Sequence, residues 1–320
     1  MEFRKLIKFG SNSHVISLPR TWLIKNKLEK GAVVYFHENG NNELILAPVE
    51  HQFKQEDKEI VIDANKKELT TLKRELISAY IKGYNIIRMV DSEMKNRAVE
   101  IRNELQNLMA LEIMEQTQTS ISARVFLNTP DVDLAALLRR MDTTIRSMFV
   151  DFKESLKDSN DSYSHLSYRD QDINRAYFVI LRITNLGMED SKLASALKLT
   201  AKDLFNFWSI AFHLENFGDE IKRIAELKSN TKLNKNTTEA VLRILSEIET
   251  AYNSVMKSYY TNDIESALKY SDTRKKLFER CNEFYVQLNR QPDNLRVLSI
   301  SERLKNMVEL LNKISRRVYD

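Results

Sequence analysis

The absence of proline between residues 131 and 291 is the feature that most constrains this sequence. Because proline breaks the interior of a helix, a proline-free stretch of this length favours long helices. Within residues 201–228, apolar side chains recur at alternating spacings of three and four, as they do on a helix that buries one face in a bundle. Polar segments such as KDSNDSYS and KSNTKLNKN separate the candidate helices. The sequence therefore predicts an antiparallel bundle, with helices at 131–158, 169–186, 190–198, 201–228, 236–260, 263–290 and 295–318.

The first 50 residues have a different pattern. The apolar runs FRKLIKF, HVISL, AVVYFHE and ELILA have the composition of strands, and the polar turns GSNS and NGNN follow the first and third of them. The segment PRTWLIKNKLEKG, between the second and third runs, has a proline suited to a first helical turn and a glycine suited to a helix end. This order predicts a ββαββ unit. Because so short a unit buries too little apolar surface alone, we expect a second chain to complete its core.

Residues 51–130 mix the two patterns. EIVIDA, NIIRMV and SISARVFL are typical of strands, whereas KELTTLKRELISAYIKGY and MKNRAVEIRNELQNLMALEIME are typical of helices. The predicted order is β-α-β-α-β, which favours one small sheet covered by two helices.

The whole chain is therefore expected to be multidomain and mainly α. We predict a β domain at 1–50, an α/β connecting domain at 51–130 and a helical bundle at 131–320. A faint internal repeat divides the bundle: DINRAYF, which begins at Asp172, matches DTRKKLF, which begins at Asp272, and HLENFGDEIKRI is echoed by ISERLKNMVELL. Two three-helix repeats, at about 131–230 and 236–320, would explain both matches.

Composition narrows the class of protein. No apolar run approaches the length of a membrane span, and MEFRKLIKFG lacks the features of a signal peptide, so we expect a cytoplasmic protein without membrane insertion. Cys281 is the only cysteine, which excludes an intrachain disulfide and a thiolate metal site. The net charge is only +4, yet residues 1–30 contain seven cations and two acids. A basic end on a near-neutral body indicates a polyanionic partner.

Glu215, Gly218 and Asp219 are unexpected in a helix. The two acids lie four residues apart and repel each other, and a glycine in a helix interior costs about 1 kcal/mol relative to alanine. A bound cation would turn this repulsion into chelation, because hard metal ions prefer carboxylate oxygens. The alternative is an ordinary charged face beside Lys222 and Arg223, with the glycine easing helix packing. The residue types alone leave both interpretations open.

Two segments resemble known families. YRDQDINRAYFVILRITNL together with LTAKDLFNFWSIAFHLENFGDEIKRIAEL resembles the first repeat of PhoU-type phosphate-signalling proteins. ISLPRTWLIKNKLEKGAVV and its surroundings resemble a SpoVT/AbrB-like DNA-binding domain, in which two chains interleave their hairpins. The combination is similar to the fused AbrB–PhoU regulators of archaea. The resemblance implies a homodimer formed through the N-terminal domain.

The resemblance also implies site residues. PhoU-type bundles host metals on carboxylates, and the matching positions imply a divalent or iron-type metal at Asp170, Asn174, Glu215 and Asp219. Asn174 stands where an acid is usual. Glu302 and Asn306 replace the Glu-x-x-x-Asp pair in the second repeat, and both departures lower the expected affinity. In the AbrB-like domain, basic residues of the first hairpin and the helix meet DNA, with Ser13 and His14 expected in the turn; the matching positions are Arg4, Lys5, Lys8, Ser13, His14, Arg20 and Lys25.

The sequence lacks the motifs of an enzyme. It has no glycine-rich phosphate loop, nucleophile elbow or zinc motif, and no histidine follows a glutamate by three residues, as a ferritin-type di-iron site requires. We therefore expect a transcriptional regulator of phosphate homeostasis that binds DNA. The alternative is an adaptor that contacts a phosphate transporter or a sensor kinase without binding DNA.

Overall fold

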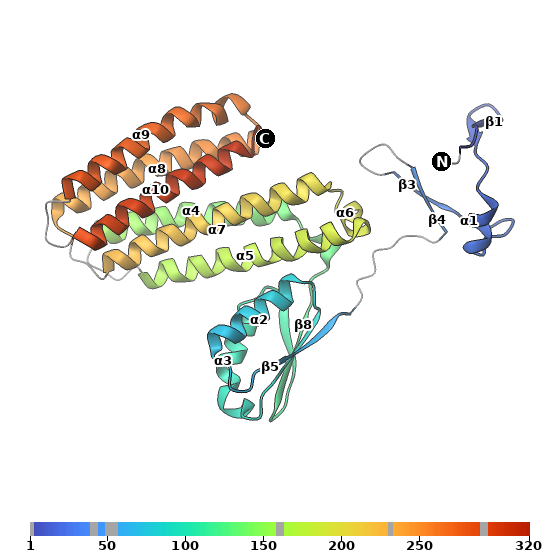
Figure 1. Cartoon of the computed structure of the whole chain (residues 1–320), viewed down its shortest axis with the longest axis horizontal. Helices are drawn as coiled ribbons and strands as arrows, with labels where there is room; N and C mark the ends of the chain where they lie inside the picture. Colours follow the sequence, from blue (N-terminus) through green and yellow to red (C-terminus); the bar gives the residue numbers. More distant parts are fainter. Residues whose placement is uncertain (1–2, 39–43, 49–56, 158–162, 230–232, 289–293) are drawn as a thin grey trace. The chain divides into compact units, whose positions relative to one another are not determined.

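The structure, a computed structural model, describes residues 3–38, 44–48, 57–157, 163–229, 233–288 and 294–320. It divides into two compact units, Met1–Lys54 and Gln55–Asp320, each of which is described by itself (Figure 1). The expected boundary near residue 50 lies outside the described residues. The second unit contains both the α/β segment and the bundle.

The first unit contains two separate hairpins and a short helix. Strand β1 (Ile7–Phe9) pairs with β2 (Ser13–Val15), α1 spans Arg20–Lys25, and β3 (Tyr35–Glu38) pairs with β4 (Leu44–Ala47). The ββαββ order agrees with the sequence pattern. Among the described residues of this unit, Ala47 is the only buried apolar side chain. Large apolar side chains such as Phe3 and Phe9, 82% and 68% exposed, remain in contact with solvent.

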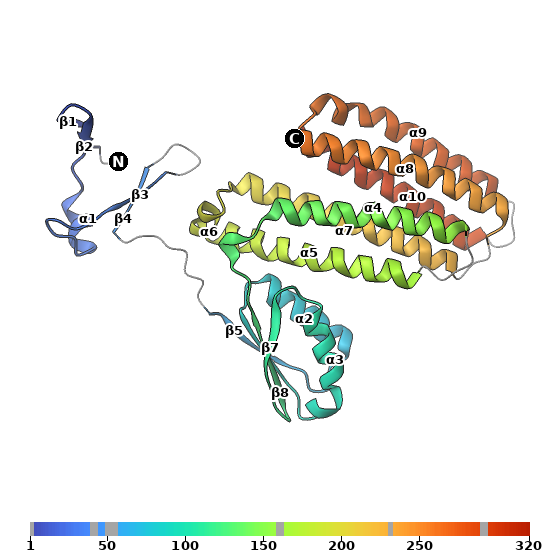
Figure 2. The same cartoon turned by 180° about the vertical axis from the view of Figure 1, so that it is seen from behind.

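The α/β segment forms a four-stranded sheet in the order β5-β6-β8-β7. Figures 1 and 2 show α2 and α3 on the same face of this sheet. Strand β6 runs parallel to β5 and antiparallel to β8, which also pairs with β7. The bounds are β5 Glu59–Asp63, α2 Leu69–Ile81, β6 Ile86–Val90, α3 Met94–Gln106, β7 Leu111–Gln116 and β8 Ser120–Val125.

The second helix of this segment was predicted too long. Residues 94–115 were expected to form one helix, but α3 ends at Gln106, and Ala110 has a positive φ of 59°. Leu111 and Ile113 then alternate along β7 and pair with Val125 and Ala123 of β8. A strand buried on one face needs apolar residues at every second position, a pattern that two residues are too few to show against a helical background.

The remainder of the chain is helical. The 3₁₀ turn η1 (Thr129–Asp131) precedes the bundle, in which α4, α5 and α7 pack together, as do α8, α9 and α10. Contacts of α7 with α10, and of α4 with α8, join the two groups. Rings of Phe149, Phe217 and Tyr252 meet there with centroids 5.0 to 5.7 Å apart. The bounds are α4 Leu134–Lys157, α5 Tyr163–Glu189, α6 Ser191–Ala196, α7 Ala201–Ser229, α8 Lys235–Thr261, α9 Ile264–Leu288 and α10 Asn294–Arg316.

Arg182 of α5 connects the bundle to the α/β segment. Its side chain is fully buried, and its guanidinium donates hydrogen bonds to the carbonyl oxygens of Tyr80, Gly83 and Tyr84 and to Oδ1 of Asn85, at 2.5 to 3.2 Å. These carbonyls lie at the C-terminal end of α2, where the helix dipole favours a cation. Burial lowers the pKa of Arg182 to about 10, so the group stays charged at neutral pH.

Gly83 permits this close approach. Its φ of +85° is readily adopted only by glycine, and an added Cβ would lie 2.5 Å from Cδ2 of Leu186 on α5. The end of α2 and the middle of α5 therefore form one packed joint.

Across the parts of the chain that the structure describes, no helix is both long and apolar enough to cross a membrane.

Candidate functional site

The acidic residues identified from the sequence converge between α5 and α7. Asp170 and Asn174 lie one turn apart on α5, and the Asn174 amide donates a hydrogen bond to Oδ2 of Asp170 at 3.2 Å. Asp219 of α7 lies opposite, and the ammonium group of Lys222 bridges the two carboxylates, 2.5 Å from Oδ2 of Asp170 and 3.0 Å from Oδ1 of Asp219. The other oxygen of Asp219, Oδ2, accepts an ion pair from Arg223 at 2.9 Å. The cation between these two acids is thus supplied by the protein itself.

Glu215 lies one turn before Asp219 and has a different environment. Burial, followed by repulsion from Asp219 and Asp170, raises the pKa of Glu215 to about 7. Burial raises the pKa of Tyr177 to about 12, with a further contribution from the nearby Glu215 carboxylate. Burial also raises the pKa of Asp170, against the opposing effect of Lys222. The group is therefore a partly desolvated cluster in which charge is shared between neighbours.

Gly218 has a packing role in this structure. An added Cβ would lie 2.8 Å from Cδ1 of Ile173 on α5 and 3.7 Å from Sδ of Met148 on α4. Glycine thus allows α7 to approach two neighbouring helices closely. This explains the residue without a ligand, and the same approach brings Asp219 within reach of Asp170 through Lys222.

The fit of a metal ion depends on Lys222. Among the described residues, no group of three or more His, Cys, Asp and Glu side chains is arranged to hold a metal. The Lys222 ammonium takes the space between Asp170 and Asp219 that a metal ion would need. The four residues predicted to bind metal do lie together, but they do not form a ready metal site, because Lys222 would have to withdraw first. Metal binding at this position stays a prediction.

The second repeat does not reproduce the cluster. The side chain of Glu302 is 59% exposed and pairs with Lys305 of its own helix at 2.8 Å. The buried acid at this level of the bundle is Glu220, which receives Arg303 of α10 at 3.3 Å and Arg223 at 3.6 Å. Ionic contacts of α7 thus extend to α5 on one side and to α10 on the other.

The residues predicted to contact DNA are all exposed in the first unit. Lys8 lies directly across the hairpin from His14, and Phe9 lies across from Ser13. Ser13 and His14 were expected in the turn, but both belong to β2, because the turn itself is completed by residues 10–12. Arg20 begins α1 and Lys25 ends it. The hairpin therefore brings Lys8, Ser13 and His14 together, while Arg4 and Lys5 precede it.

The sequence analysis missed the roles of Lys222 and Arg182. Lys222 follows Asp219 by three residues, so a contact along the helix could have been expected, but the contact with Asp170 depends on how two helices pack. Arg182 gave no signal, because an arginine in an amphipathic helix ordinarily points to solvent.

The geometry defines a class of protein: a small basic unit with an incomplete core, followed by an α/β segment and a helical bundle that carries a charged cluster. Comparison with protein families agrees with this description. Residues 7–52 match the family described as antidote-toxin recognition MazE, bacterial antitoxin, and residues 138–227 match the PhoU domain. The chain therefore combines a MazE/AbrB-like N-terminal domain with a PhoU domain, as the resemblance implied.

The two matches have clear limits. The PhoU match covers α4 to α7, the first three-helix group, and residues 236–320 lie outside both matches. A PhoU domain implies regulation of phosphate homeostasis, and a MazE/AbrB-like domain suggests DNA binding or an antitoxin-like function. Searches of curated proteins and of solved structures gave no match.

Proposed function

We propose that this protein is a transcriptional regulator of phosphate homeostasis, a homodimer that binds DNA through its N-terminal unit and receives its signal through the PhoU-like bundle. The observation that carries the proposal is the first unit itself, which has a MazE/AbrB-like sequence, exposed basic residues and an unfinished core.

The dimer follows from the exposed apolar surface. Eleven large apolar side chains of the first 45 residues are exposed, among them Ile24, Val33 and Phe36 at 62% to 67%. Burial of apolar area contributes roughly 25 cal/mol per Å², so leaving these groups in water forgoes several kcal/mol. A second copy of the same unit, pairing hairpin against hairpin, would bury them symmetrically. This supports a dimer in which each chain completes the core of the other.

DNA binding is supported by the arrangement of charge. The basic side chains Arg4, Lys5 and Lys8 lie on or just before the first hairpin, and two copies in a dimer would present six such cations. Contacts of this kind bind phosphate groups and release counterions, which makes the affinity depend on salt. The bundle is near-neutral by comparison and supplies the PhoU-like part, which is suited to contacts with components of phosphate transport or signalling.

A gel-shift titration tests the proposal. The full chain is tested against the DNA upstream of its own gene and against phosphate-transport promoters, at several salt concentrations. We expect binding that is lost in large part when Arg4, Lys5 and Lys8 are replaced by alanine, and a log-affinity versus log-salt slope that becomes shallower by about 0.9 for each phosphate contact removed.

The matched control replaces three exposed lysines of the bundle, Lys257, Lys275 and Lys276, by alanine. It changes net charge equally and should bind DNA as the wild type does. If both triple variants bind alike, or if the wild type binds no DNA, the adaptor function gains. Pull-down of transporter or sensor-kinase components by the full chain would then be the next measurement. Size-exclusion chromatography with light scattering tests the dimer separately, and a monomeric chain would contradict it.

A further inference from the structure

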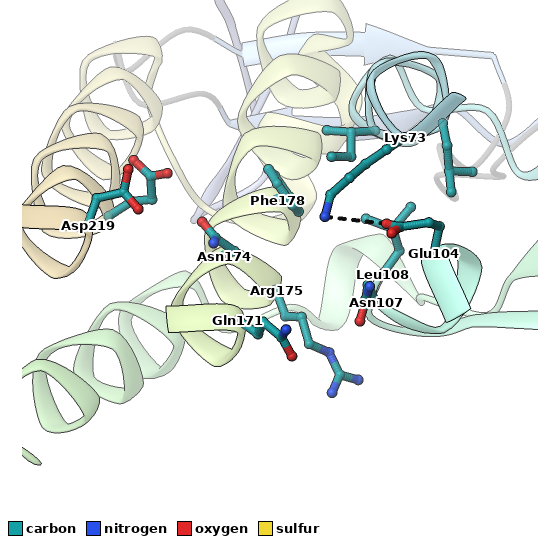
Figure 3. Close-up of a pocket in the computed structure, with 12 residues that line it drawn as sticks. Lys73, Glu104, Asn107, Leu108, Gln171, Asn174, Arg175, Phe178 and Asp219 are labelled. Atoms are coloured by element: carbon teal, nitrogen blue, oxygen red, sulfur yellow. Dashed lines mark ion pairs between the residues drawn. The ribbon is translucent and has the colours of Figure 1, made fainter. Parts of the chain in front are cut away.

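A cavity lies where the α/β segment meets the bundle. Its volume is about 300 Å³, and its walls come from α2, from the end of α3, from α5 and from α7 (Figure 3). Pockets that bind small molecules start at about this size. It therefore matches a small metabolite rather than a nucleotide or a peptide.

The walls of the cavity are fixed by the structure around it. Gln171, Asn174, Arg175 and Phe178 line it from α5, and their spacing of three and four places them on the same face as Arg182. Arg182 joins that face to the end of α2 through four hydrogen bonds. A cavity bounded by two clamped elements is preformed, which lowers the entropic cost of binding.

The lining has an apolar part and two charged ends. Leu76 and Leu108 are buried, and the ring of Phe178 lies on the α5 side between Asn174 and Lys73 in Figure 3. Lys73 pairs with Glu104 at 3.4 Å and so has its own partner. An aliphatic or aromatic group of a ligand has a matching wall between the polar positions.

Arg175 is the cation that lacks a partner. Among the described residues, no ion pair or hydrogen bond of its guanidinium is found, and its Nε is buried without an acceptor. A buried donor left unpaired costs about 1 to 3 kcal/mol. An anionic group of a ligand would satisfy it.

The α7 side of the cavity has the opposite charge. Glu215 and Asp219 contribute carboxyl groups there, and Asp219 is already paired with Lys222 and Arg223. Glu104 adds a third acid to the lining. Three carboxyl groups oppose a phosphate ion in the same space, and the unpaired Arg175 opposes a ligand that is only a cation. A ligand with one carboxylate and one ammonium group fits both ends.

We propose that this cavity binds a free amino acid with an apolar side chain. The carboxylate would pair with Arg175, the ammonium group would face Glu215, and the side chain would pack on Phe178, Leu76 and Leu108. The site belongs to the second unit alone and does not depend on whether the first unit binds DNA.

Calorimetry and thermal shift on the full chain test the proposal. The probes are the twenty standard amino acids and inorganic phosphate, followed by the tightest-binding amino acid without its amino group and without its carboxylate. We expect one apolar amino acid to bind once per chain and to raise Tm, and both truncated analogues to bind at least on the order of tenfold more weakly.

Two variants and a control locate the site. Arg175→Met should weaken the binding of the amino acid by on the order of tenfold or more, while leaving the binding of its decarboxylated analogue unchanged. Gln171→Trp places a bulky side chain at an exposed position of the lining and should block all probes. Arg243→Met, at an exposed position of α8 away from the cavity, should bind as the wild type does.

Three results would overturn the proposal: no amino acid binding at millimolar concentration, phosphate binding that is tighter than that of any amino acid, or binding that both cavity variants leave intact. If Arg175→Met fails to fold, which circular dichroism would show, the Gln171→Trp variant gives the decision on its own.

Discussion

Replacing Arg182 with methionine tests the joint between the α/β segment and the bundle. Methionine keeps much of the apolar stem but removes all donors, so the carbonyl oxygens of Tyr80, Gly83 and Tyr84 and the Asn85 amide lose the guanidinium that they share. Each buried acceptor left unpaired costs about 1 to 3 kcal/mol, and methionine packing recovers part of the loss. Arg182 is fully buried, so solvent screens none of this. We expect the free energy of unfolding to fall by about 3 to 5 kcal/mol.

Urea unfolding followed by circular dichroism measures this loss, and limited proteolysis near residues 126–133 reports whether the joint opens. Arg182→Lys should be intermediate, because an ammonium group has three donors and cannot reach four acceptors arranged as a fork. The surface variant Arg243→Met should stay within about 0.5 kcal/mol of the wild type. A loss below about 1 kcal/mol for Arg182→Met would mean that the buried charge costs as much as its hydrogen bonds contribute.

Three further predictions concern the charged groups of α7. Lys222→Gln should destabilise the chain by about 3 kcal/mol, because it leaves Asp170 and Asp219 facing each other without a cation; added Mg²⁺ or Mn²⁺ should restore part of the lost Tm. The wild type should keep its Tm in chelator and carry no metal by elemental analysis, because Lys222 already neutralises the carboxylates; a drop in Tm would favour the metal site instead. Burial, with Lys313 and Arg317 nearby, lowers the pKa of His213 from 6.5 to about 4, so the unfolded chain binds the extra proton and stability is lost as the pH falls through this range. Urea titrations at pH 7.5 and 4.5 should show a loss about 1 to 2 kcal/mol smaller for His213→Phe than for the wild type, an amount reduced because the imidazole is partly exposed, and an equal loss would contradict the assignment.

The sequence was sufficient for the long helices because each one repeats its apolar spacing over several turns. The expected helix at 201–228 is Ala201–Ser229 in the structure, and the expected helix at 236–260 is Lys235–Thr261. Strand β7 was missed because six residues show too few repeats of a two-residue period, and its neighbours favoured a helix. Pattern length thus decided which elements could be predicted.

The candidate site was only partly predictable for a related reason. Spacing along one helix placed Glu215 and Asp219 together, and the family resemblance added Asp170 and Asn174 from another helix. The position of Lys222 between two helices, and the cavity beside Phe178, depend on how α2, α5 and α7 pack. Such contacts between distant segments leave no periodic signal in a single sequence.

The exposed apolar side chains of the first unit also bear on gene dosage. In the proposed dimer, two chains must meet before either unit is complete, so when chains are scarce the number of finished units varies with the square of their concentration. Halving the supply of this protein would then remove about three quarters of its assembled units. Such a chain would respond to its own rate of synthesis as steeply as to any signal that reaches its bundle, and a cell that carries one defective copy of the gene would lose more than half of the activity.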